Sequence, residues 1–597
     1  MDRNSAIGMT LIAVLLMVYF YFFSPAPTPP PSKKADSIAS VLKKEIADQV
    51  PTKPDSAVIQ SYGNLGSLLE GKEEITNVEN NDLRIALSSN GYIKNVELKN
   101  FKTYSQKPLY LINNGNNSFS LKAQHDSKEV DLYKLFYQSE TAKKGDSTVV
   151  TLTAKIADNA FVKHTYSVPA AGFMIGYKIE SSGLSFTGKN IAFQWQDAIP
   201  LQEKDLEDSR RKTTVNYYLA DGKFDGLGEG LDVEEEPLAT PVKWVSIRQK
   251  FFISSIIAQN SFAGGELRMS TNVADSSVVK DTRVELFIPT ENVSTKKANF
   301  NYYFGPNDYE IVTKVTKGFE ENLSLGWPPM SWINRFVIIP IFHFLQKYIS
   351  NYGLIIILLV LLVKIVLLPL SYTSYLGMAK MKLLKPEMDA IKEKNADNMA
   401  QSQQDTMKLY KQAGVNPFSG CIPLILQMPI LFAMFYFFPI AIGLRQKHFL
   451  WAEDLSTYDS ILNLPFTIPF YGDHVSLFVL LMTISTLIYT WQNNQITSVT
   501  GPMKSMSYIM PIVLVFVLNS FSAGLSFYYF VSNLITFAQQ AVIKRFVDED
   551  KIKALMEENK KKAATGTGKK SKFMTKLEEA MKASEEARKA SATKKKK

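Results

Sequence analysis

The chain is poor in cysteine and, outside one tail, in net charge. Cys421 is the single cysteine among 597 residues, which excludes a disulfide framework, a zinc ribbon and an iron–sulfur centre within one chain. Lys and Arg exceed Asp and Glu by 10, but residues 544–597 alone hold 18 basic and 9 acidic residues. The rest is nearly neutral, and its hydrophobic residues gather in long runs. This pattern indicates a membrane protein with a large water-soluble insertion.

Residues 1–23 are predicted to form a signal-anchor span. Ala6 to Phe23 are 18 uncharged, apolar residues, nearly enough to cross a hydrocarbon core of about 30 Å. A cleaved signal peptide is the alternative, and the run of prolines that starts at Pro25 disfavours it. Residues 24–53, rich in Pro, Lys and Ser, are expected to be a flexible linker.

Residues 54–325 show the alternation of β-strands. Val150, Leu152 and Ala154 alternate with polar neighbours, and Asn90-Gly91 between two strand-like runs indicates a tight hairpin. We expect an all-β sandwich in this region. Its acidic run, Glu234 to Glu236, is expected to be a solvated loop rather than a metal site.

Hydrophobic helices are predicted after this domain. The apolar positions of residues 326–350 share one helical face, and Arg335, His343 and Lys347 favour an interfacial amphipathic helix over a spanning one. The remaining predictions are span 2 at 351–372, a cytoplasmic helical hairpin at 373–417 with Asp397 as N-cap of its second helix, span 3 at 418–444, a periplasmic loop at 445–474, span 4 at 475–491, a cytoplasmic loop at 492–505, span 5 at 506–521, span 6 at 525–543 and a basic tail at 544–597.

The distribution of basic residues predicts the orientation. Seven lysines lie between Lys380 and Lys411, whereas the loop after span 3 has only Arg445 and Lys447 near its start. Because basic loops stay in the cytoplasm, both termini and the hairpin are expected there and the β-domain outside. The predicted fold class is therefore a polytopic α-helical membrane protein of six spans with an external all-β sandwich domain.

Lys364 is the one charged residue within the apolar run Leu354–Leu370. A charge at that depth costs about 2.5–3.5 kcal/mol on insertion scales, so Lys364 is expected to face protein or water. The alternative is a side chain that snorkels to the membrane interface.

Polar residues on other spans follow helical spacing. The last span carries Ser526, Tyr529, Asn533, Thr536 and Gln540 on one stripe, span 4 carries Thr483 and Thr486, and span 3 carries Gln427. Interhelical hydrogen bonding is the alternative explanation for each stripe. Together with Lys364, the three polar faces predict a wet cavity that is not a through-pore.

No hydrolytic or phosphoryl-transfer site is evident, and neither a cofactor nor a metal is expected. The run Thr565 to Ser571 lacks the upstream glycine and the preceding strand of a phosphate-binding loop. His448, Glu453 and Asp454 share one external loop, for which a plain surface loop is favoured over a metal or acid–base cluster. The protein is therefore not expected to be an enzyme.

Three motifs resemble the YidC/Oxa/Alb membrane protein insertases. They are Asn416-Pro417-Phe418-Ser419-Gly420-Cys421-Ile422-Pro423 with Gln427-Met428-Pro429, the segment Gly524 to Leu534, and Met378-Ala379-Lys380-Met381. They occur in the order that the family requires. The anchor and the external β-domain further resemble the branch of the family from bacteria with two membranes.

The resemblance implies a five-helix core around a hydrophilic groove that opens to cytoplasm and lipid. It places Lys364 where the family has an arginine, and Tyr528 and Tyr529 where the family contacts its substrate. Lysine keeps the charge but lacks the planar fork of arginine. The implied localisation is the bacterial inner membrane. The implied partners are nascent membrane proteins, a ribosome bound through the tail, the lipid bilayer and, as an open alternative to independent action, the Sec translocon; DNA is not expected.

The main functional hypothesis is a membrane protein insertase that uses no nucleotide. It would move polar segments through the groove and release apolar helices into lipid. The alternatives are a secondary transporter of a small anion that uses Lys364, and a passive assembly scaffold that uses the β-domain. For the tail, the alternative to ribosomal RNA is anionic lipid.

Overall fold

The computed structural model describes residues 56–230, 233–395, 398–416, 422–469, 471–496 and 502–565. They form two compact units. The sheet unit consists of residues 56–324 with Ile440–Gln446, and the helical unit of Leu325–Pro439 with residues 447–565. The predicted span at 1–23, the linker at 24–53, the motif residues 417–421 and the tail from 566 onward lie outside the described residues.

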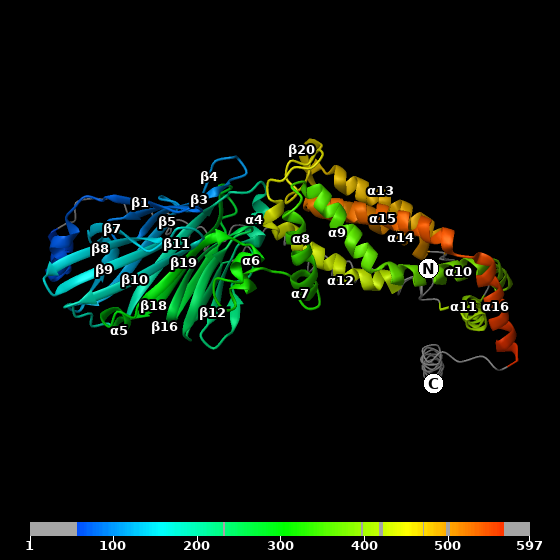
Figure 1. The fold of residues 1–597 in the computed structure, drawn as a ribbon, viewed down its shortest axis with the longest axis horizontal. Helices are drawn as coiled ribbons and strands as arrows, with labels where there is room; N and C mark the ends of the chain where they lie inside the picture. Colours follow the sequence, from blue (N-terminus) through cyan, green and yellow to red (C-terminus); the bar gives the residue numbers. More distant parts are fainter. Residues whose placement is uncertain are drawn as a thin grey trace, which may run out of the picture. The chain divides into compact units, whose positions relative to one another are not determined.

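Within the described residues, the sheet unit contains three antiparallel sheets (Figure 1). Their strand orders are β1-β2-β3-β4, then β13-β12-β15-β16-β19-β10-β9-β8-β7, then β14-β17-β18-β11-β5-β6. The strands are β1 Ile75–Glu79, β2 Leu83–Ser88, β3 Ile93–Lys102, β4 Pro108–Ile112, β5 Asn117–His125, β6 Lys128–Asp131, β7 Gln138–Lys144, β8 Ser147–Ala157, β9 Ala160–Pro169, β10 Met174–Ser182, β11 Asn190–Pro200, β12 Thr214–Leu219, β13 Phe224–Gly226, β14 Glu234–Leu238, β15 Val242–Arg248, β16 Phe252–Phe262, β17 Gly265–Ser270, β18 Val278–Pro289 and β19 Asn299–Pro306. Short helical pieces connect them: α3 Ser56–Ser61, η1 Gly63–Leu69, η2 Leu132–Lys134, α4 Leu206–Lys212, α5 Thr290–Ser294, α6 Tyr309–Val312 and η3 Phe319–Asn322.

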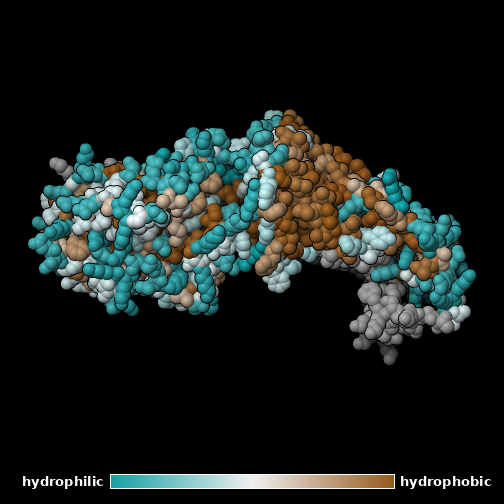
Figure 2. All heavy atoms as spheres, viewed as in Figure 1, coloured by the Kyte–Doolittle hydropathy of each residue, from teal (hydrophilic) through white to brown (hydrophobic). Residues whose placement is uncertain are grey.

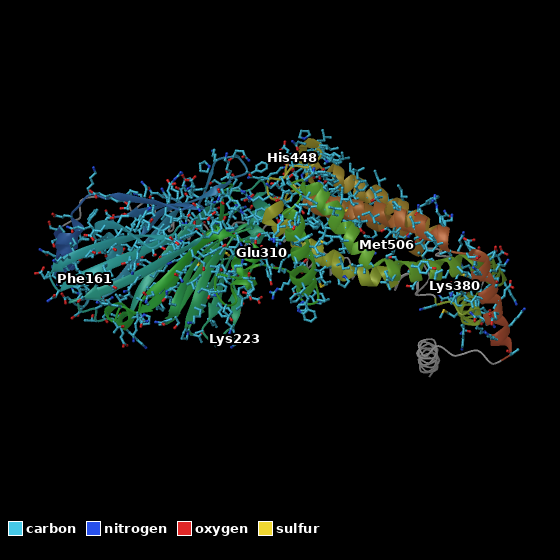
Figure 3. The ribbon with its side chains drawn as sticks, viewed as in Figure 1. Phe161, Lys223, Glu310, Lys380, His448 and Met506 are labelled. Carbon is cyan, nitrogen blue, oxygen red and sulfur yellow. The ribbon has the colours of Figure 1, made fainter. Side chains whose placement is uncertain are left out.

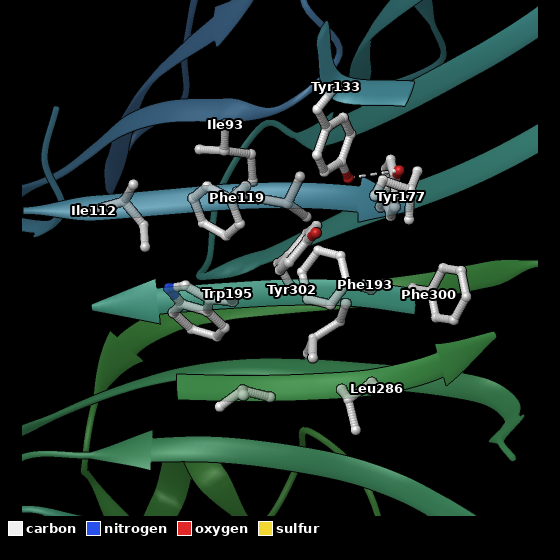
Figure 4. Packing of buried hydrophobic residues seen from close by; sticks show 14 of the residues in the cluster. Ile93, Ile112, Phe119, Tyr133, Tyr177, Phe193, Trp195, Leu286, Phe300 and Tyr302 are labelled. Atoms are coloured by element: carbon white, nitrogen blue, oxygen red, sulfur yellow. Dashed lines mark hydrogen bonds between the residues drawn. The ribbon is translucent and has the colours of Figure 1, made fainter. Parts of the chain in front are cut away.

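Alternating apolar side chains build the core between the two larger sheets. In β8, Val150, Leu152 and Ala154 are buried while their neighbours are partly exposed, as the sequence predicted. Trp195 of β11 meets Phe304 of β19 at a ring distance of 6.5 Å, so the two sheets face each other. Figure 4 shows this core and the 3.0 Å hydrogen bond between the hydroxyl groups of Tyr133 and Tyr177. The all-β prediction for this region is confirmed.

Two local predictions for the sheet unit had different outcomes. Asn90-Gly91 does form the tight turn between β2 and β3, where Gly91 has φ of 95°, a conformation that favours glycine. The loop predicted at Glu234 to Glu236 was wrong, because these residues begin the edge strand β14, and Glu235 pairs with Arg268 of β17 at 3.1 Å. Charged side chains are common on edge strands, since one side of such a strand faces water.

Ile440–Gln446 belongs to the sheet unit although it is distant from it in the sequence. The Arg445 side chain is buried there, and its Nε donates to both carboxylate oxygens of Glu203 at 2.9 and 3.1 Å. Its Nη2 donates to the carbonyl oxygen of Lys102 at 2.6 Å, and its guanidinium lies 5.1 Å from the ring centre of Phe252. A charge-assisted pair of this kind fixes the segment firmly.

Helices and one β-hairpin form the helical unit. The bounds are α7 Met330–Ile333, the π-helical turn η4 Asn334–Ile338, α8 Ile339–Gln346, α9 Tyr352–Val366, α10 Leu368–Lys394, α11 Met399–Ala413, α12 Ile422–Phe437, the short turns η5 Phe438–Ile440 and η6 Ile442–Leu444, β20 Leu462–Ile468, β21 Gly472–Val475, α13 Leu477–Ile496, α14 Pro502–Leu518, α15 Ala523–Phe546 and α16 Glu549–Ala564. Between η5 and β20 the chain passes through the sheet unit at Ile440–Gln446, which contains η6.

The helix predicted over span 2 is broken. The sequence predicted one element over residues 351–372, whereas α9 ends at Val366 and α10 continues after a bend of 64°. Pro369 explains the break, because it has no N–H for the carbonyl of Ile365 and its ring crowds that turn. Among the described residues no single helix has the length and apolar composition of a membrane crossing, although α9 and α10 together do. The count of six spans stays a prediction.

Two further helix predictions need correction. The helix predicted within 326–350 is present at residues 330–346 but is not regular, because the π-helical turn η4 lies between α7 and α8; its interfacial position stays a prediction. At the start of the π-helical turn, the buried Asn334 amide donates to the carbonyl oxygens of Leu325 and Ala433 at 3.0 and 2.9 Å. The second helix of the predicted hairpin is capped by Asn398, which accepts from the N–H of Gln401 at 3.1 Å, and not by Asp397.

Exposed apolar side chains gather on α9, α13 and α14 of the helical unit. Figure 2 shows a broad hydrophobic face over these helices, whereas the sheet unit is mainly hydrophilic on the face shown. The exposed apolar residues include Leu362, Ile365 and Val366 of α9, Ile484 and Ile488 of α13, and Ile509, Ile512 and Phe516 of α14. A patch of this extent is uncommon on a soluble monomer and indicates contact with an apolar phase.

Candidate functional site

A polar cavity lies among the helices of the helical unit. The cavity has a volume of about 130 Å³ and is partly open. Its walls come from α9, α10, α12, α13 and α15, which are distant in sequence but converge here. The polar residues that line it are Lys364, Ser371, Ser374, Tyr375, Gln427, Thr486, Tyr489, Tyr528, Tyr529, Ser532, Asn533, Thr536, Gln539 and Gln540.

Lys364 contributes a buried amine to this cavity. The residue is 5% exposed, and its Nζ donates to Oγ1 of Thr536 on α15 at 2.9 Å. Gln539 of α15 in turn donates to the carbonyl oxygen of Lys364 at 3.0 Å. Among the described residues, no carboxylate pairs with Lys364. The side chain therefore points across to α15 instead of snorkelling outward.

Asn533 links α15 to α13 at the wall of the cavity. Its Nδ2 donates to Oγ of Ser485 at 2.9 Å and to Oγ1 of Thr486 at 3.0 Å. Interhelical hydrogen bonding, the alternative explanation for these polar residues, therefore applies to Asn533 and Thr486. Both residues also line the cavity, so the two explanations hold together at this point.

Aromatic residues complete the wall on α15. Tyr528 and Tyr529 line the cavity, and the ring of Tyr528 lies 5.6 Å from that of Phe438. On α12, Met428, Ile430 and Leu431 add apolar surface beside Gln427. The cavity thus offers both hydrogen-bonding and apolar contacts.

The N-terminal end of α13 is held by a buried carboxylate. Asp459 accepts from the N–H groups of Leu477 and Phe478 at 2.9 and 3.1 Å, and from Nε1 of Trp451 at 2.8 Å. It also accepts from the hydroxyl of Ser476. A carboxylate at a helix N-terminus satisfies free N–H groups and interacts favourably with the helix dipole. Asp459 therefore ties the first turn of α13 to the loop that precedes it.

Eight of the ten residues predicted for the site line one cavity. They are Lys364, Gln427, Thr486, Tyr528, Tyr529, Asn533, Thr536 and Gln540. Thr483 and Ser526 do not line it: Thr483 is buried and donates to the carbonyl oxygen of Val479 on its own helix at 2.8 Å, and Ser526 is buried in the first turns of α15.

Sequence reasoning missed six polar residues of the wall. Ser371, Ser374 and Tyr375 reach it because α10 bends by 64° from α9 near Pro369, and that proline was the available signal. Ser532 and Gln539 precede Asn533 and Gln540 by one position, which shows that the polar stripe on α15 is wider than one row. Tyr489 follows Thr486 by three positions on α13.

Among the described residues, the loop with His448, Glu453 and Asp454 does not bring three metal ligands together. Asp454 is buried and accepts from the N–H and the hydroxyl of Ser456 at 2.8 and 2.7 Å. Within the described part of the chain, no group of three His, Cys, Asp or Glu side chains is placed to hold a metal ion.

The helical unit exposes apolar side chains on α9, α13 and α14 and encloses a cavity with polar residues on its walls. This is the reverse of a soluble helical bundle, and buried charge facing a cavity is typical of functional sites in membrane proteins. The exposed apolar face, the cavity and the fold therefore define a membrane protein with polar side chains around an internal cavity and with a separate all-β domain.

Comparison with known proteins gives the family. Residues 344–551 match the family model described as 60Kd inner membrane protein, and residues 75–340 match the YidC periplasmic domain. The membrane protein insertase YidC of Amoebophilus asiaticus (strain 5a2) is 43% identical over 599 residues, which cover 98% of this chain and 99% of that protein. The one from Cytophaga hutchinsonii is 45% identical over 614 residues, 98% of each chain. A crystal structure of an active YidC insertase has 18% identity and a TM-score of 0.32, over 84% of this chain and 99% of that chain.

Relatives with more than 40% identity over nearly the full length decide the assignment: the chain belongs to the YidC family. The sheet unit is the periplasmic β-sandwich domain of this family, and the membrane concerned is the bacterial inner membrane.

Proposed function

We propose that the protein inserts other membrane proteins into the bacterial inner membrane. The names of its relatives, membrane protein insertase, support this function, and none of the comparisons favours transport of a small anion. The cavity residues are proposed as the surface along which a substrate's polar segment moves.

A single observation carries the mechanism: a buried lysine that contacts a hydroxyl and, among the described residues, no carboxylate, in a cavity within helices that expose apolar side chains. Each unsatisfied backbone group of a peptide costs several kcal/mol in hydrocarbon, so even a short polar loop crosses lipid with difficulty. Hydroxyl, amide and ammonium groups on the cavity wall replace part of the lost hydration. Lys364 adds attraction for acidic groups of the moving segment.

Release of the substrate's apolar helix is proposed to occur between α12 and α15. Both helices line the cavity, α12 with Met428, Ile430 and Leu431 and α15 with Tyr528 and Tyr529. Apolar contact on these walls would let a hydrophobic helix leave the polar cavity toward lipid. Burial of its apolar surface in lipid drives this step, so no nucleotide and no cofactor are required.

The proposed topology has six spans, with both termini and the pair α10–α11 in the cytoplasm and the sheet unit in the periplasm. The seven lysines on or near α10 and α11 support this orientation. Lys380, labelled in Figure 3, is one of them. Nascent membrane proteins are the proposed substrates, and the ribosome and the Sec translocon are proposed partners. Binding of the basic tail to ribosomal RNA should weaken as salt rises.

Insertion of a small two-span substrate into liposomes that contain the purified protein tests the proposal. Lys364→Met removes the charge at similar volume and should lower the insertion yield several-fold, whereas Lys364→Arg should retain most of it. Thr486→Val should also reduce insertion, because it removes a hydroxyl from the cavity wall.

Thr483→Val is the matched control. Thr483 and Thr486 lie one turn apart on α13 and both donate to a carbonyl oxygen of their own helix at 2.8 Å, but Thr483 lies outside the cavity. The control should insert substrate like the unaltered protein. Unchanged insertion by a combined Lys364→Met, Thr486→Val, Asn533→Leu variant would reject the cavity as the route.

A further inference from the structure

Helices α10, α11 and α16 pack around one methionine-rich cluster. Met378, Met381, Leu384 and Met388 follow one face of α10 at helical spacing, and we name these four residues the methionine face. Residues from the other two helices join it: Leu409, Tyr410 and Ala413 of α11, Val415 after it, and Ile552 and Met556 of α16. The hydroxyl of Tyr410 lies 3.3 Å from the sulfur of Met388. The start of the predicted tail is therefore the third helix of a small bundle.

The ion pairs that α16 makes with α10 involve side chains near the surface. Ile552 and Met556 are its buried side chains among those described, while Leu555 is 47% exposed. Two ion pairs join it to α10, Lys382 with Glu549 at 3.3 Å and Glu387 with Lys560 at 2.5 Å, and both are exposed. Exposed ion pairs contribute little and weaken in salt. An apolar helix with a complete hydrophobic face would bury more surface here than α16 does.

The methionine face continues into the cavity. Met378 belongs to the face and also lines the cavity, together with Ser374 and Tyr375 one turn before it on α10. A helix lying on the face would therefore end at the cavity. Methionine side chains are unbranched and flexible, so such a surface adapts to helices of different sequence.

We propose that the methionine face binds an apolar helical segment of a substrate, and that α16 covers the face until this segment displaces it. The occupant is argued from α16 itself, since the structure seats an amphipathic helix on this surface. The inference rests on the proposed function and adds a receiving surface ahead of the cavity. It also gives α16 the role of shielding the methionine face from unspecific apolar contacts when no substrate is bound.

Photocrosslinking in the full-length protein tests this inference. A benzophenone side chain replaces Met388, and ribosomes stalled on a nascent chain with one apolar helix are added to membranes. Without nascent chain, the probe should crosslink to α16; with it, nascent-chain products should appear and α16 products should fall. Met556→Asp should raise the nascent-chain yield several-fold. Leu555→Asp makes the same chemical change at the neighbouring, half-exposed position and should leave the yield unchanged.

A charge-reversal pair covers the case in which Met556→Asp fails to fold. Lys560→Glu places two carboxylates together at Glu387 and should also raise the nascent-chain yield, and Glu387→Lys in the same protein should restore the original value. Absence of nascent-chain products at position 388, or equal yields in all variants, would overturn the inference. A second benzophenone probe in place of Thr536 separates the two proposals. Nascent-chain crosslinks at position 536 without crosslinks at position 388 would reject the methionine face alone. No nascent-chain crosslinks at either position would reject the insertase cavity as well.

Discussion

Asp197 makes the sheet unit less stable as pH rises. The residue is 2% exposed in β11, and its neighbours across the sheet are Asn117 and Thr282. Burial, with repulsion from Asp281, raises the pKa of Asp197 to about 8, although the amide of Asn117 offsets part of the effect. The folded form therefore keeps a proton that the unfolded chain has already lost. The free energy of unfolding falls by about 1.4 kcal/mol for each pH unit between the two pKa values, or about 4 kcal/mol by pH 7.

Asp197→Asn removes this cost at nearly constant volume. The Tm of the variant minus that of the parent should be near zero at pH 4 and grow to the order of 10 °C at pH 8, because a domain of this size gains about 2–4 °C per kcal/mol. Thermal unfolding of the detergent-solubilised protein measures the Tm, and hydrogen exchange of β11 assigns the change to this domain. Asp158→Asn alters a carboxylate whose side chain is 95% exposed and should show no such trend. A Tm difference that stays constant from pH 4 to 8 would refute the reasoning.

Three further changes have expected outcomes. Burial lowers the pKa of His164 to about 3, so the folded unit loses stability as pH falls from about 6.5 toward 3, and His164→Gln should flatten that part of the Tm curve. Arg445→Met leaves the partly buried Glu203 carboxylate without its Arg445 partner and should destabilise the sheet unit by about 3 kcal/mol, the low end of the range for buried pairs; adding Glu203→Gln should recover part of this loss of Tm. Asp459→Ala removes the acceptor for Leu477 and Phe478, which should speed hydrogen exchange in the first turn of α13 while the last turn of α13 keeps its rate.

Much of the fold could be predicted because buried apolar residues recur at regular intervals along strands and helices. Alternation at Val150, Leu152 and Ala154 predicted β8, and Asn90-Gly91 predicted a turn that requires positive φ. Glu234 to Glu236 were assigned wrongly because an edge strand tolerates charges that composition assigns to loops. The break after Val366 was missed because hydrophobicity continues across Pro369 although the backbone hydrogen bonding does not.

The cavity could be predicted in part for a related reason. Helical spacing places Asn533, Thr536 and Gln540 on one face, and the charge of Lys364 in an apolar run demands a polar partner, which proved to be Thr536. Spacing does not reveal how a helix is rotated against its neighbours. Thr483 and Thr486 fit the same stripe, yet only Thr486 accepts from Asn533 and lines the cavity. Contacts that come from another part of the chain, such as Arg445 with Glu203, leave no local signal.

Water access to the cavity is the central claim, and cysteine labelling tests it most directly. Because Cys421 is the single cysteine, Cys421→Ser gives a background in which Thr536→Cys and Asn533→Cys report on the cavity and Ile512→Cys on the exposed apolar face. In native membranes, a water-soluble maleimide should label positions 536 and 533 within a few-fold of the rate at the exposed Lys408→Cys, and leave position 512 nearly unlabelled. Cavity positions as unreactive as position 512 would contradict a hydrated route for polar peptide.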